Sequence, residues 1–289
     1  ITSCSPGWIN YCEHYFPEFL PNLSTCKSPQ QMFGAIAKSW YAQKLGIAPE
    51  NIFVVSIMPC TAKKYECKRP EQSANGVADV DVALTSRELA RMIERAGIDF
   101  VNLPDEKFDD PMGVSTGAAV IFGATGGVME AALRTAAEWL TGDPAAPVEF
   151  CDVRGTGNVK EATYTVGGLT LNVAVTSGLA NAREVLESVK RGEKNYHFIE
   201  VMACPGGCIS GGGQPKTSVP PSDWVRKERM QSIYAIDAKI YKKRLSHENK
   251  EVMDLYADYL GSPNGEKAHK LLHTTYTDRS GHLTAKNKA

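Results

Sequence analysis

The chain has 289 residues, a length that allows one large domain or two ordinary ones. It is 43% hydrophobic and 22% charged, which is the balance of a folded globular protein and argues against a disordered chain. The 32 Lys and Arg residues nearly match the 33 Asp and Glu residues, and the net charge is −1. This balance argues against a nucleic-acid-binding protein that works through a general cationic surface.

Membrane and targeting signals are absent from the sequence. No apolar run reaches the roughly 18 residues that a membrane-spanning helix needs, so we expect no span. The chain opens with Ile1 inside a motif-like stretch, so we expect that further sequence precedes it, together with any targeting segment. We expect a cytoplasmic protein, with the periplasm left open as an alternative.

The first half of the chain alternates predicted helices and strands. Ser28, Pro29 and Gln31 form a capping-box pattern, which predicts a helix that runs to about Leu45 and stops at Gly46. The other elements predicted here are a buried strand over 52–57, a strand over 79–84, a helix capped by Thr85 and Glu88 that has Leu89, Met92 and Ile93 on one face and ends before Gly97, and a helix over 126–140.

The second half repeats this alternation. We predict a strand over 148–153, a hairpin of 162–166 and 169–176 joined at Gly167-Gly168, a helix over 179–190 and a strand over 197–202. Such alternation predicts an α/β fold, two lobes of mixed sheets flanked by helices. Since strands of both lobes are followed by cysteines, we expect a cluster of thiolates, and with it the metal cluster, in the cleft between the lobes. From about Trp224 a helical segment follows, with helices over 229–246, 248–260 and 266–273 and a polar end over 280–289.

The eight cysteines do not form a disulfide scaffold, since they are too sparse for one. No Cys-x-x-Cys pair exists, which argues against a zinc finger, a thioredoxin-like site and a bacterial ferredoxin run. Cys60 and Cys204 each follow a predicted strand, at the strand ends where α/β sheets bind ligands. We interpret four other cysteines as inert small hydrophobic residues, namely Cys12, Cys26, Cys67 and Cys151.

Three segments carry the candidate chemistry: Thr2–Trp8 with Cys4, Met58–Glu66 with Cys60 and Lys63, and Glu200–Cys208 with its Cys-Pro-Gly-Gly-Cys turn. A run of three glycines, 211–213, follows the last segment and lets the backbone approach a bulky ligand. Thiolates gathered in a glycine-rich pocket suit a soft metal centre, above all an iron–sulfur cluster.

In order and separation, these three segments resemble the three signature motifs of the iron-only (FeFe) hydrogenase catalytic domain, over residues 1–215. The helical tail, with 246–249 and 271–273, resembles the small-subunit segment that is a separate chain in some members. The resemblance implies a catalytic domain over 1–220 and a small-subunit-like segment over 221–289. It implies reversible oxidation of dihydrogen and reduction of protons.

The implied cofactor is the H-cluster, a 4Fe–4S cubane joined through one cysteine sulfur to a di-iron subcluster with CO, cyanide and azadithiolate. By motif position, Cys60 and Cys204 would bind the cubane, Cys208 would bridge to the di-iron unit, and Lys63 would hydrogen-bond a cyanide. The residues expected around the di-iron unit are Pro59, Met58, Met202, Gln30 and Phe122. Ser24 matches a hydroxyl step of the family's proton path.

One departure concerns the first motif, where the family has two adjacent cysteines, a proton carrier and then a cubane ligand. Here Cys4 occupies the first position and Ser5 the second. Three alternatives follow: the Ser5 oxygen binds iron, Cys4 turns inward to become the ligand, or the cubane has only three thiolates and is labile. Cys4 stays the preferred proton carrier if the usual geometry holds.

The resemblance also implies partners. The chain would exchange electrons with ferredoxin or with a nicotinamide-linked diaphorase subunit, and maturation proteins would insert the cofactor; no nucleic acid is expected. Two other functions compete: a hydrogen sensor with slow turnover, and a hydrogenase-like cytosolic iron–sulfur assembly protein that binds no di-iron unit. The sequence disfavours the assembly protein, because Cys4, Lys63 and the glycine-rich third segment serve only the di-iron site.

Overall fold

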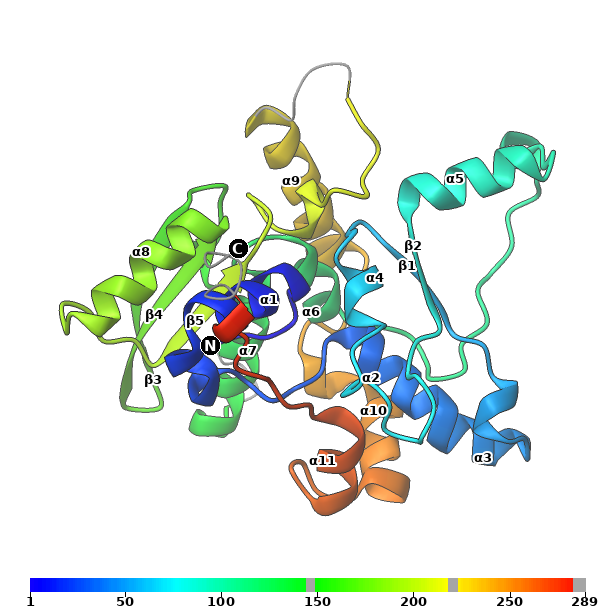
Figure 1. Ribbon diagram of the computed structural model, residues 1–289, viewed down its shortest axis with the longest axis horizontal. Coiled ribbons are helices and arrows are strands. Elements are labelled where there is room, and N and C mark those ends of the chain that lie inside the picture. The colour runs from blue at the N-terminus through cyan, green and yellow to red at the C-terminus, as the bar shows by residue number, and fades with distance from the viewer. Residues whose placement is uncertain (144–148, 218–222, 283–289) are drawn as a thin grey trace.

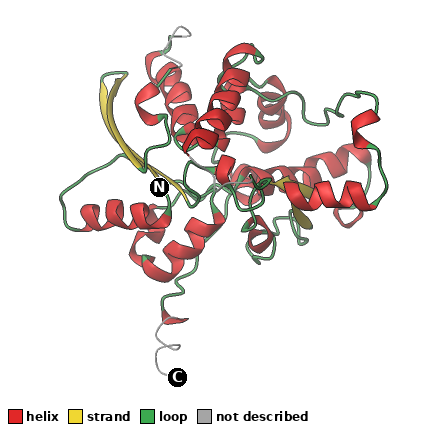
Figure 2. Cartoon of the chain, turned by 90° about the horizontal axis from the view of Figure 1, so that it is seen from above, coloured by secondary structure: helices red, strands yellow, loops and turns green. Residues whose placement is uncertain are grey.

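The computed structural model describes residues 1–143, 149–217 and 223–282, which form two separate sheets with helices around them (Figures 1 and 2). In Figure 1 the three-stranded sheet lies on the left, the two-stranded sheet on the right, and the first helix between them. The mixed α/β fold that the sequence predicted is confirmed. Within the described ranges, no helix has the length and hydropathy for crossing a membrane.

The three-stranded sheet has the order β3-β4-β5, with β3 (Val159–Val166), β4 (Leu169–Ser177) and β5 (Phe198–Met202). The predicted hairpin is confirmed, since β3 and β4 pair antiparallel on either side of Gly167-Gly168. Helix α8 (Leu179–Lys190) connects β4 to β5, which pair in parallel. Crossover by a helix is the usual connection between parallel strands.

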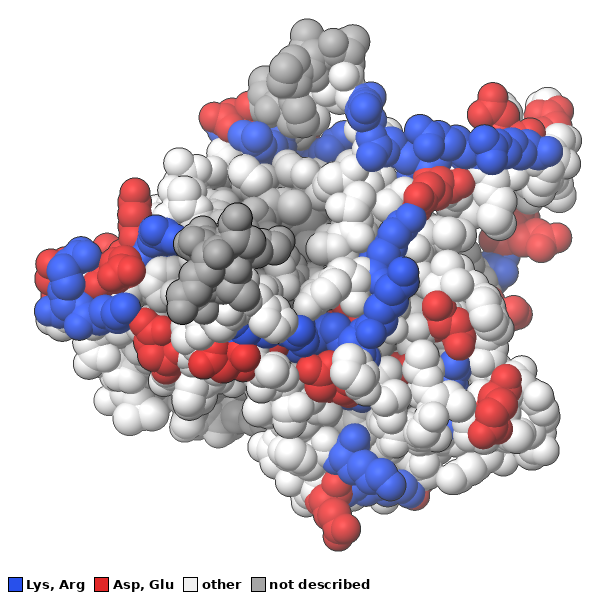
Figure 3. All heavy atoms as spheres, viewed as in Figure 1, with Lys and Arg blue, Asp and Glu red and all other residues white. Residues whose placement is uncertain are grey.

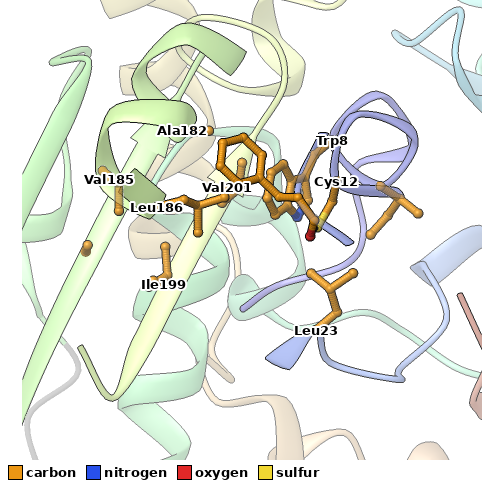
Figure 4. Packing of buried hydrophobic residues seen from close by; sticks show 11 residues of the cluster. Trp8, Cys12, Leu23, Ala182, Val185, Leu186, Ile199 and Val201 are labelled. Carbon is orange, nitrogen blue, oxygen red and sulfur yellow. The ribbon is translucent and has the colours of Figure 1, made fainter. Parts of the chain in front are cut away.

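Helices cover both faces of this sheet because the side chains of its central strand alternate in direction. Ala174 of β4 packs in a cluster with α1 (Pro6–Tyr15) and α8, where Trp8 is fully buried (Figure 4). Val173 and Val175 face the opposite cluster, which includes the apolar side of α7 (Gly127–Thr141). The sheet is therefore a rigid layer that fixes the loop after β5.

The two-stranded sheet pairs β1 (Val55–Met58) in parallel with β2 (Val82–Thr85). The helix predicted before it is present, but a π-helical turn divides it: α2 (Pro29–Ile36), the turn Ala37–Tyr41, and α3 (Ala42–Leu45). It ends at Gly46, whose φ of 67° suits glycine, as predicted.

Two sequence-based predictions about this region are wrong. Ser28 makes no side-chain cap, because its hydroxyl donates to the buried carboxylate of Glu66 instead. The strand β1 is not buried on both sides: Ser56 points inward, whereas Val55 and the preceding Phe53, which is 69% exposed, point outward. A sheet of only two strands with one covered side leaves alternate apolar residues facing outward.

Helix α5 (Ser86–Arg95) begins with the predicted capping box of Thr85 and Glu88 and is followed by Gly97. No residue of this helix is buried in the described chain, and Met92 on its apolar face is 57% exposed. The strand predicted over 148–153 is also wrong where it can be compared: Cys151–Val153 is a 3₁₀ turn, and Val148 lies outside the described residues. Phe150 and Val153, three residues apart, face one cluster, a spacing that fits 3₁₀ geometry.

The C-terminal helices differ from the predicted bounds. Helix α9 (Asp223–Lys239) begins and ends earlier than expected, because the chain turns back after Lys239 so that Arg244 can bond Asp237. The remaining helical elements are α4 (Lys63–Glu66), α6 (Gly117–Val120), α10 (Lys250–Leu255) with a π-turn over Tyr256–Leu260, α11 (Glu266–Leu272), and 3₁₀ turns over 17–22, 49–51, 100–102, 121–123, 208–210 and 246–248.

The end of the described chain returns to its beginning. Cys26 and His273 form a β-bridge, and the Thr274 N–H donates to the Thr25 carbonyl at 2.7 Å. Farther along, Arg279 donates through Nε to the Glu13 carboxylate on α1 at 3.0 Å. The C-terminal segment therefore holds the turn that follows α1 as well as the helix itself.

Candidate metal centre

The second and third segments meet where the two sheets deliver them. Cys60 follows β1 by two residues, and Cys204 follows β5 by two residues. The loop after Cys208 then packs on the loop before Cys60, because the Gly213 N–H donates to the Pro59 carbonyl at 2.8 Å. The predicted convergence of cysteines from strand ends is therefore physically present.

Close approach of these loops requires glycine at position 211. A Cβ atom built on Gly211 would lie 2.1 Å from the Pro59 carbonyl oxygen, whereas one on Gly212 would meet Thr61 Oγ1 at an ordinary 3.4 Å. The φ of Gly211 is −58°, so the requirement concerns space alone and not backbone conformation. The glycine run therefore fixes the distance between the second and third segments.

The thiols of Cys60, Cys204 and Cys208 lie within electrostatic reach of one another. Burial raises the pKa of Cys208 to about 11; the positive charge of Lys63 opposes this rise, and thiolates at Cys60 and Cys204 add to it. Burial also raises the pKa of Cys204, as does a charge at Cys60, while the Gly212 N–H opposes the rise. All eight cysteines are free of disulfides.

The chemistry of the donor atoms suits an iron–sulfur cluster. No group of three or more His, Cys, Asp or Glu side chains in the described part of the chain converges on a point where one metal ion would sit. A cubane presents four separate irons, so its thiolates approach different atoms and stay farther apart from each other. Half-buried thiols from two loops, Cys60 in one and Cys204 and Cys208 in the other, are soft donors of the kind that iron–sulfur clusters prefer.

The first segment lies along β5, beside the third. The Thr2 N–H donates to the Ile199 carbonyl, and the Val201 N–H donates to Thr2 Oγ1, both at 3.0 Å. Farther along, the Ala203 N–H donates to Ser5 Oγ at 3.2 Å. These bonds align Cys4 and Ser5 with the loop that carries Cys204.

Lys63 joins the first and second segments. Its ammonium donates to the Cys4 carbonyl at 3.0 Å and to both Glu66 oxygens at 3.1 Å. Burial raises the pKa of the Cys4 thiol to about 12, against the effect of Lys63 and with a smaller contribution from Cys208. Lys63 is therefore held at the site and is not a solvated side chain.

Four other residues predicted for the site lie at the strand ends or on α2. Met58 and Pro59 precede Cys60 at the end of β1, and Met202 is buried at the end of β5. Gln30 links the second segment to α2, because its amide donates to Glu66 at 2.5 Å and accepts from Ser56 at 2.7 Å.

Phe122 and Ser24 belong to different surroundings. Phe122 packs on a cluster of Ala118 and Ile121 that joins α6 to α7. Ser24 lies in the turn after α1, where its Oγ accepts the Cys26 N–H at 3.3 Å and its carbonyl accepts the Tyr276 hydroxyl. The roles that the sequence assigned to these two residues stay predictions.

Among the four cysteines interpreted as inert and buried, only Cys12 is buried. Cys67 is half-buried, and the prediction is wrong for Cys26 and Cys151, which are exposed. Cys26 lies in the bridge to His273 at the surface, and Cys151 opens a surface 3₁₀ turn. Neither site offers the apolar surroundings that a buried cysteine prefers.

Sequence reasoning assigned no role to Glu200, a fully buried acid on β5. Its carboxylate accepts the N–H groups of Gly126 at 2.6 Å and Met129 at 2.7 Å, at the N-terminus of α7. Burial raises the pKa of Glu200. A charged residue inside the apolar strand 198–202 is the signal that could have identified it.

Comparison with known proteins identifies both parts of the chain. The family model of the iron-only hydrogenase large subunit, C-terminal domain, matches residues 1–212, and that of the iron hydrogenase small subunit matches residues 223–279. The chain is 56% identical over 279 residues to the NADP-reducing hydrogenase subunit HndD of Solidesulfovibrio fructosivorans, covering 96% of this chain and 47% of that protein.

Two further relatives mark the range of similarity. The apo [FeFe]-hydrogenase HydA1 of Chlamydomonas reinhardtii, variant C377H, superposes with a TM-score of 0.82 at 41% identity, covering 96% of this chain and 75% of that one. The cytosolic Fe-S cluster assembly factor narfl of Danio rerio is 32% identical over 285 residues, covering 96% and 68%. The chain spans about half the length of its curated hydrogenase relatives. The chain belongs to the iron-only hydrogenase family.

Proposed function

We propose that the chain catalyses the reversible oxidation of dihydrogen to protons and electrons at a bound H-cluster. One observation carries this proposal: a buried lysine and a fourth cysteine, Lys63 and Cys4, lie beside Cys208, whose thiol is in turn near those of Cys60 and Cys204. A simple electron-transfer cluster needs thiolates alone, whereas a di-iron unit with anionic ligands needs a cation and a proton carrier beside it.

Cys60 and Cys204 would hold the cubane, and Cys208 would bridge it to the di-iron unit. When bound, the H-cluster supplies the iron at which the dihydrogen bond is cleaved or formed. The chain's own residues provide charge, dryness and proton traffic. Lys63 Nζ presents a fixed positive charge to an anionic ligand, and Glu66 keeps that ammonium oriented.

Proton transfer would pass through Cys4 Sγ. With its pKa raised to about 12, this thiol keeps its proton at neutral pH and can both give and receive one when a charged neighbour changes. Ser24 would serve as a later hydroxyl step. Met58, Pro59, Met202, Gln30 and Phe122 would surround the di-iron unit, and maturation proteins would insert it.

The electron partner would be a nicotinamide-linked subunit or ferredoxin. The name of the relative HndD, an NADP-reducing hydrogenase subunit, supports the nicotinamide-linked subunit. The surface of α5 supports an acidic partner: Arg87, Arg91 and Arg95 follow one another at four-residue spacing, and basic side chains form a row along this helix in Figure 3. Arg87 also donates to the Gly212 carbonyl at 2.7 Å, which links this row to the third segment.

The location and the domain division also belong to this proposal. We assign the chain to the cytoplasm, where thiols stay reduced, since all eight cysteines are free. The catalytic domain would span residues 1–220, and the small-subunit-like segment 221–289. The family matches to residues 1–212 and 223–279 support this division.

The iron–sulfur assembly function is the second candidate, favoured by the 32% identity to the assembly factor narfl. Identity to the hydrogenase subunit HndD is 56%, and Lys63 and Cys4 have no task in a protein without a di-iron unit. A hydrogen sensor would keep the same site but turn over slowly.

Replacing each of two neighbouring lysines by alanine, in separate variants, tests the proposal. Lys63 is buried at Cys4, whereas Lys64 pairs with Glu88 at the surface. In protein matured with its cofactor, Lys63→Ala should lose most of the infrared bands of metal-bound CO and cyanide, and Lys64→Ala should keep them. Absence of such bands from the wild type would refute the hydrogenase proposal. Hydrogen evolution rates then separate an enzyme from a sensor.

A further inference from the structure

We infer that the Ser5 hydroxyl oxygen is the fourth protein ligand of the cubane, and that Cys4 is not a ligand. This inference rests on the proposed function, because it takes the cubane of Cys60, Cys204 and Cys208 as given. It resolves the choice between an oxygen ligand, an inward-turned Cys4 and a three-thiolate cluster.

The backbone of the first segment prevents Cys4 and Ser5 from facing the same side. Ser5 is extended, with φ −103° and ψ 105°, and neighbouring side chains in extended backbone point in opposite directions. The segment is also fixed at both ends of this pair: Thr2 bonds β5 twice, and the Ser5 carbonyl accepts the Ile9 N–H of α1. One of the two side chains can face Cys204, and the other cannot.

Ser5 is the residue that faces Cys204. Its Oγ accepts the N–H of Ala203, the residue directly before Cys204. Cys204 itself receives the main-chain N–H of Gly212. A main-chain N–H donated to the ligand atom is the support that iron–sulfur sites give to their anionic ligands. Ser5 Oγ and Cys204 Sγ are therefore supported in the same way.

The Ser5 hydroxyl does not perform the usual task of a serine at its position. Ser5 is the N-cap residue of α1, where a serine normally accepts an N–H from the first turn, yet it makes no such bond. Within the described residues, no acceptor is found for the Ser5 hydroxyl proton. Ser5 is half-buried, so its hydroxyl proton can pass to solvent when the oxygen binds a cation.

The Cys4 thiol lies near Lys63 and Cys208. The Lys63 ammonium holds the Cys4 carbonyl at 3.0 Å, and the charges that act on the Cys4 thiol are those of Lys63, Cys208, Glu200 and Glu66. Bringing Cys4 into the place of Ser5 would need a turn of the backbone, which would move the Cys4 carbonyl away from Lys63 and Ser5 Oγ away from the Ala203 N–H. The thiol is thereby left free for proton transfer.

Binding of Ser5 to iron would exchange the hydroxyl proton for the metal and would transfer no electron. The O–H bond of the hydroxyl breaks, an O–Fe bond forms, and the proton leaves to the buffer. Oxygen is a harder donor than sulfur and favours ferric iron, so a serine-bound cubane is harder to reduce than an all-thiolate one.

The test uses the full chain, made without maturation proteins and reconstituted under anaerobic conditions with ferrous iron and sulfide. The readouts are iron per chain, the electron paramagnetic resonance spectrum and the midpoint potential. We expect Ser5→Ala to lose one of the four irons and to show a three-iron signal. Ser5→Cys should restore the fourth iron and favour reduction about tenfold, a rise of about 59 mV for one electron.

Cys4→Ala is the matched control and should keep all four irons and the wild-type spectrum. Loss of iron from Cys4→Ala, with Ser5→Ala unchanged, would make Cys4 the ligand and overturn the inference alone. Four irons in both alanine variants, with no potential shift in Ser5→Cys, would overturn it in favour of three thiolates. A wild type that takes up no cluster, or a Cys60→Ala variant that loads as well, would overturn the proposed function and the inference together.

Discussion

Replacing Gly211 by Ala should separate the second and third segments and release the cluster. The added Cβ would lie 2.1 Å from the Pro59 carbonyl oxygen, and Cβ contacts under 3.0 Å are essentially never seen. The two backbones must therefore move apart by about 0.9 Å. Pro59 directly precedes Cys60, so the displacement should move the Cys60 thiol away from that of Cys208, which lies three residues before Gly211.

The same contact sets the loss of folding free energy expected for Gly211→Ala. Overpacking of this kind costs about 1–3 kcal/mol, which lowers the melting temperature of a chain of this size by roughly 2–12 °C. Cluster binding should suffer more than folding, because misplacement of one ligand affects the cluster directly. We expect the reconstituted Gly211→Ala protein to hold less than about a tenth of the wild-type cluster, the equivalent of about 1.4 kcal/mol in affinity.

Gly212→Ala is the matched control, because its Cβ would meet Thr61 at 3.4 Å and its N–H is retained. It should match the wild type in iron content, visible absorbance and melting temperature. Wild-type iron uptake by Gly211→Ala, or equal loss of the cluster from both variants, would contradict a steric role of Gly211.

Three further outcomes are expected. Burial raises the pKa of Glu13, but Arg69, the Thr277 N–H and Arg279 together outweigh burial, so the pKa in the folded protein is lower than the usual 4.5. The stability that the ionised Glu13 contributes is therefore complete above about pH 4.5 and is lost as the pH falls through the folded pKa. Thermal melts from pH 6 to 3 should show that Glu13→Gln loses less stability in acid than the wild type does. Asp237→Asn breaks a buried pair with Arg134 and should cost about 3–5 kcal/mol in urea unfolding, with exposed Glu193→Gln as an unchanged control. In metal-free protein at pH 8, iodoacetamide should alkylate the two exposed cysteines first and spare Cys4, as mass spectrometry would detect.

Local sequence signals predicted much of the fold and the candidate ligands. The caps of α5, the bounds of α8 and the Gly167-Gly168 hairpin follow from residues near in sequence, where the determining contacts are also near. Cys60 and Cys204 could be placed together because both follow strands at the carboxyl end. Their mutual distance still depended on loop contacts, such as that of Gly211 with Pro59, which no local pattern contains.

Contacts between distant segments account for the failed predictions. Ser28 had a capping pattern, but a carboxylate 38 residues away, on Glu66, takes its hydroxyl. The sequence predicts a strand buried on both faces at β1, whereas Val55 and Phe53 are exposed. A short apolar, β-branched run has the same pattern in the sequence whether one face of the strand is covered or both. Likewise, nothing near Ser5 in sequence indicates that its partner is the N–H of Ala203.

The small-subunit-like segment contributes to the metal centre through α1. Thr277 N–H and Arg279 both bond Glu13 on this helix, and Tyr276 bonds the Ser24 carbonyl after it. Helix α1 begins at the residue after Ser5, so its orientation sets the directions of Ser5 and Cys4. The sequence of the C-terminal segment contains no cysteine, but the segment holds the helix that directly follows Ser5. If Ser5 is a ligand as we propose, loss of the Glu13 contacts should therefore disturb the metal centre as well as α1.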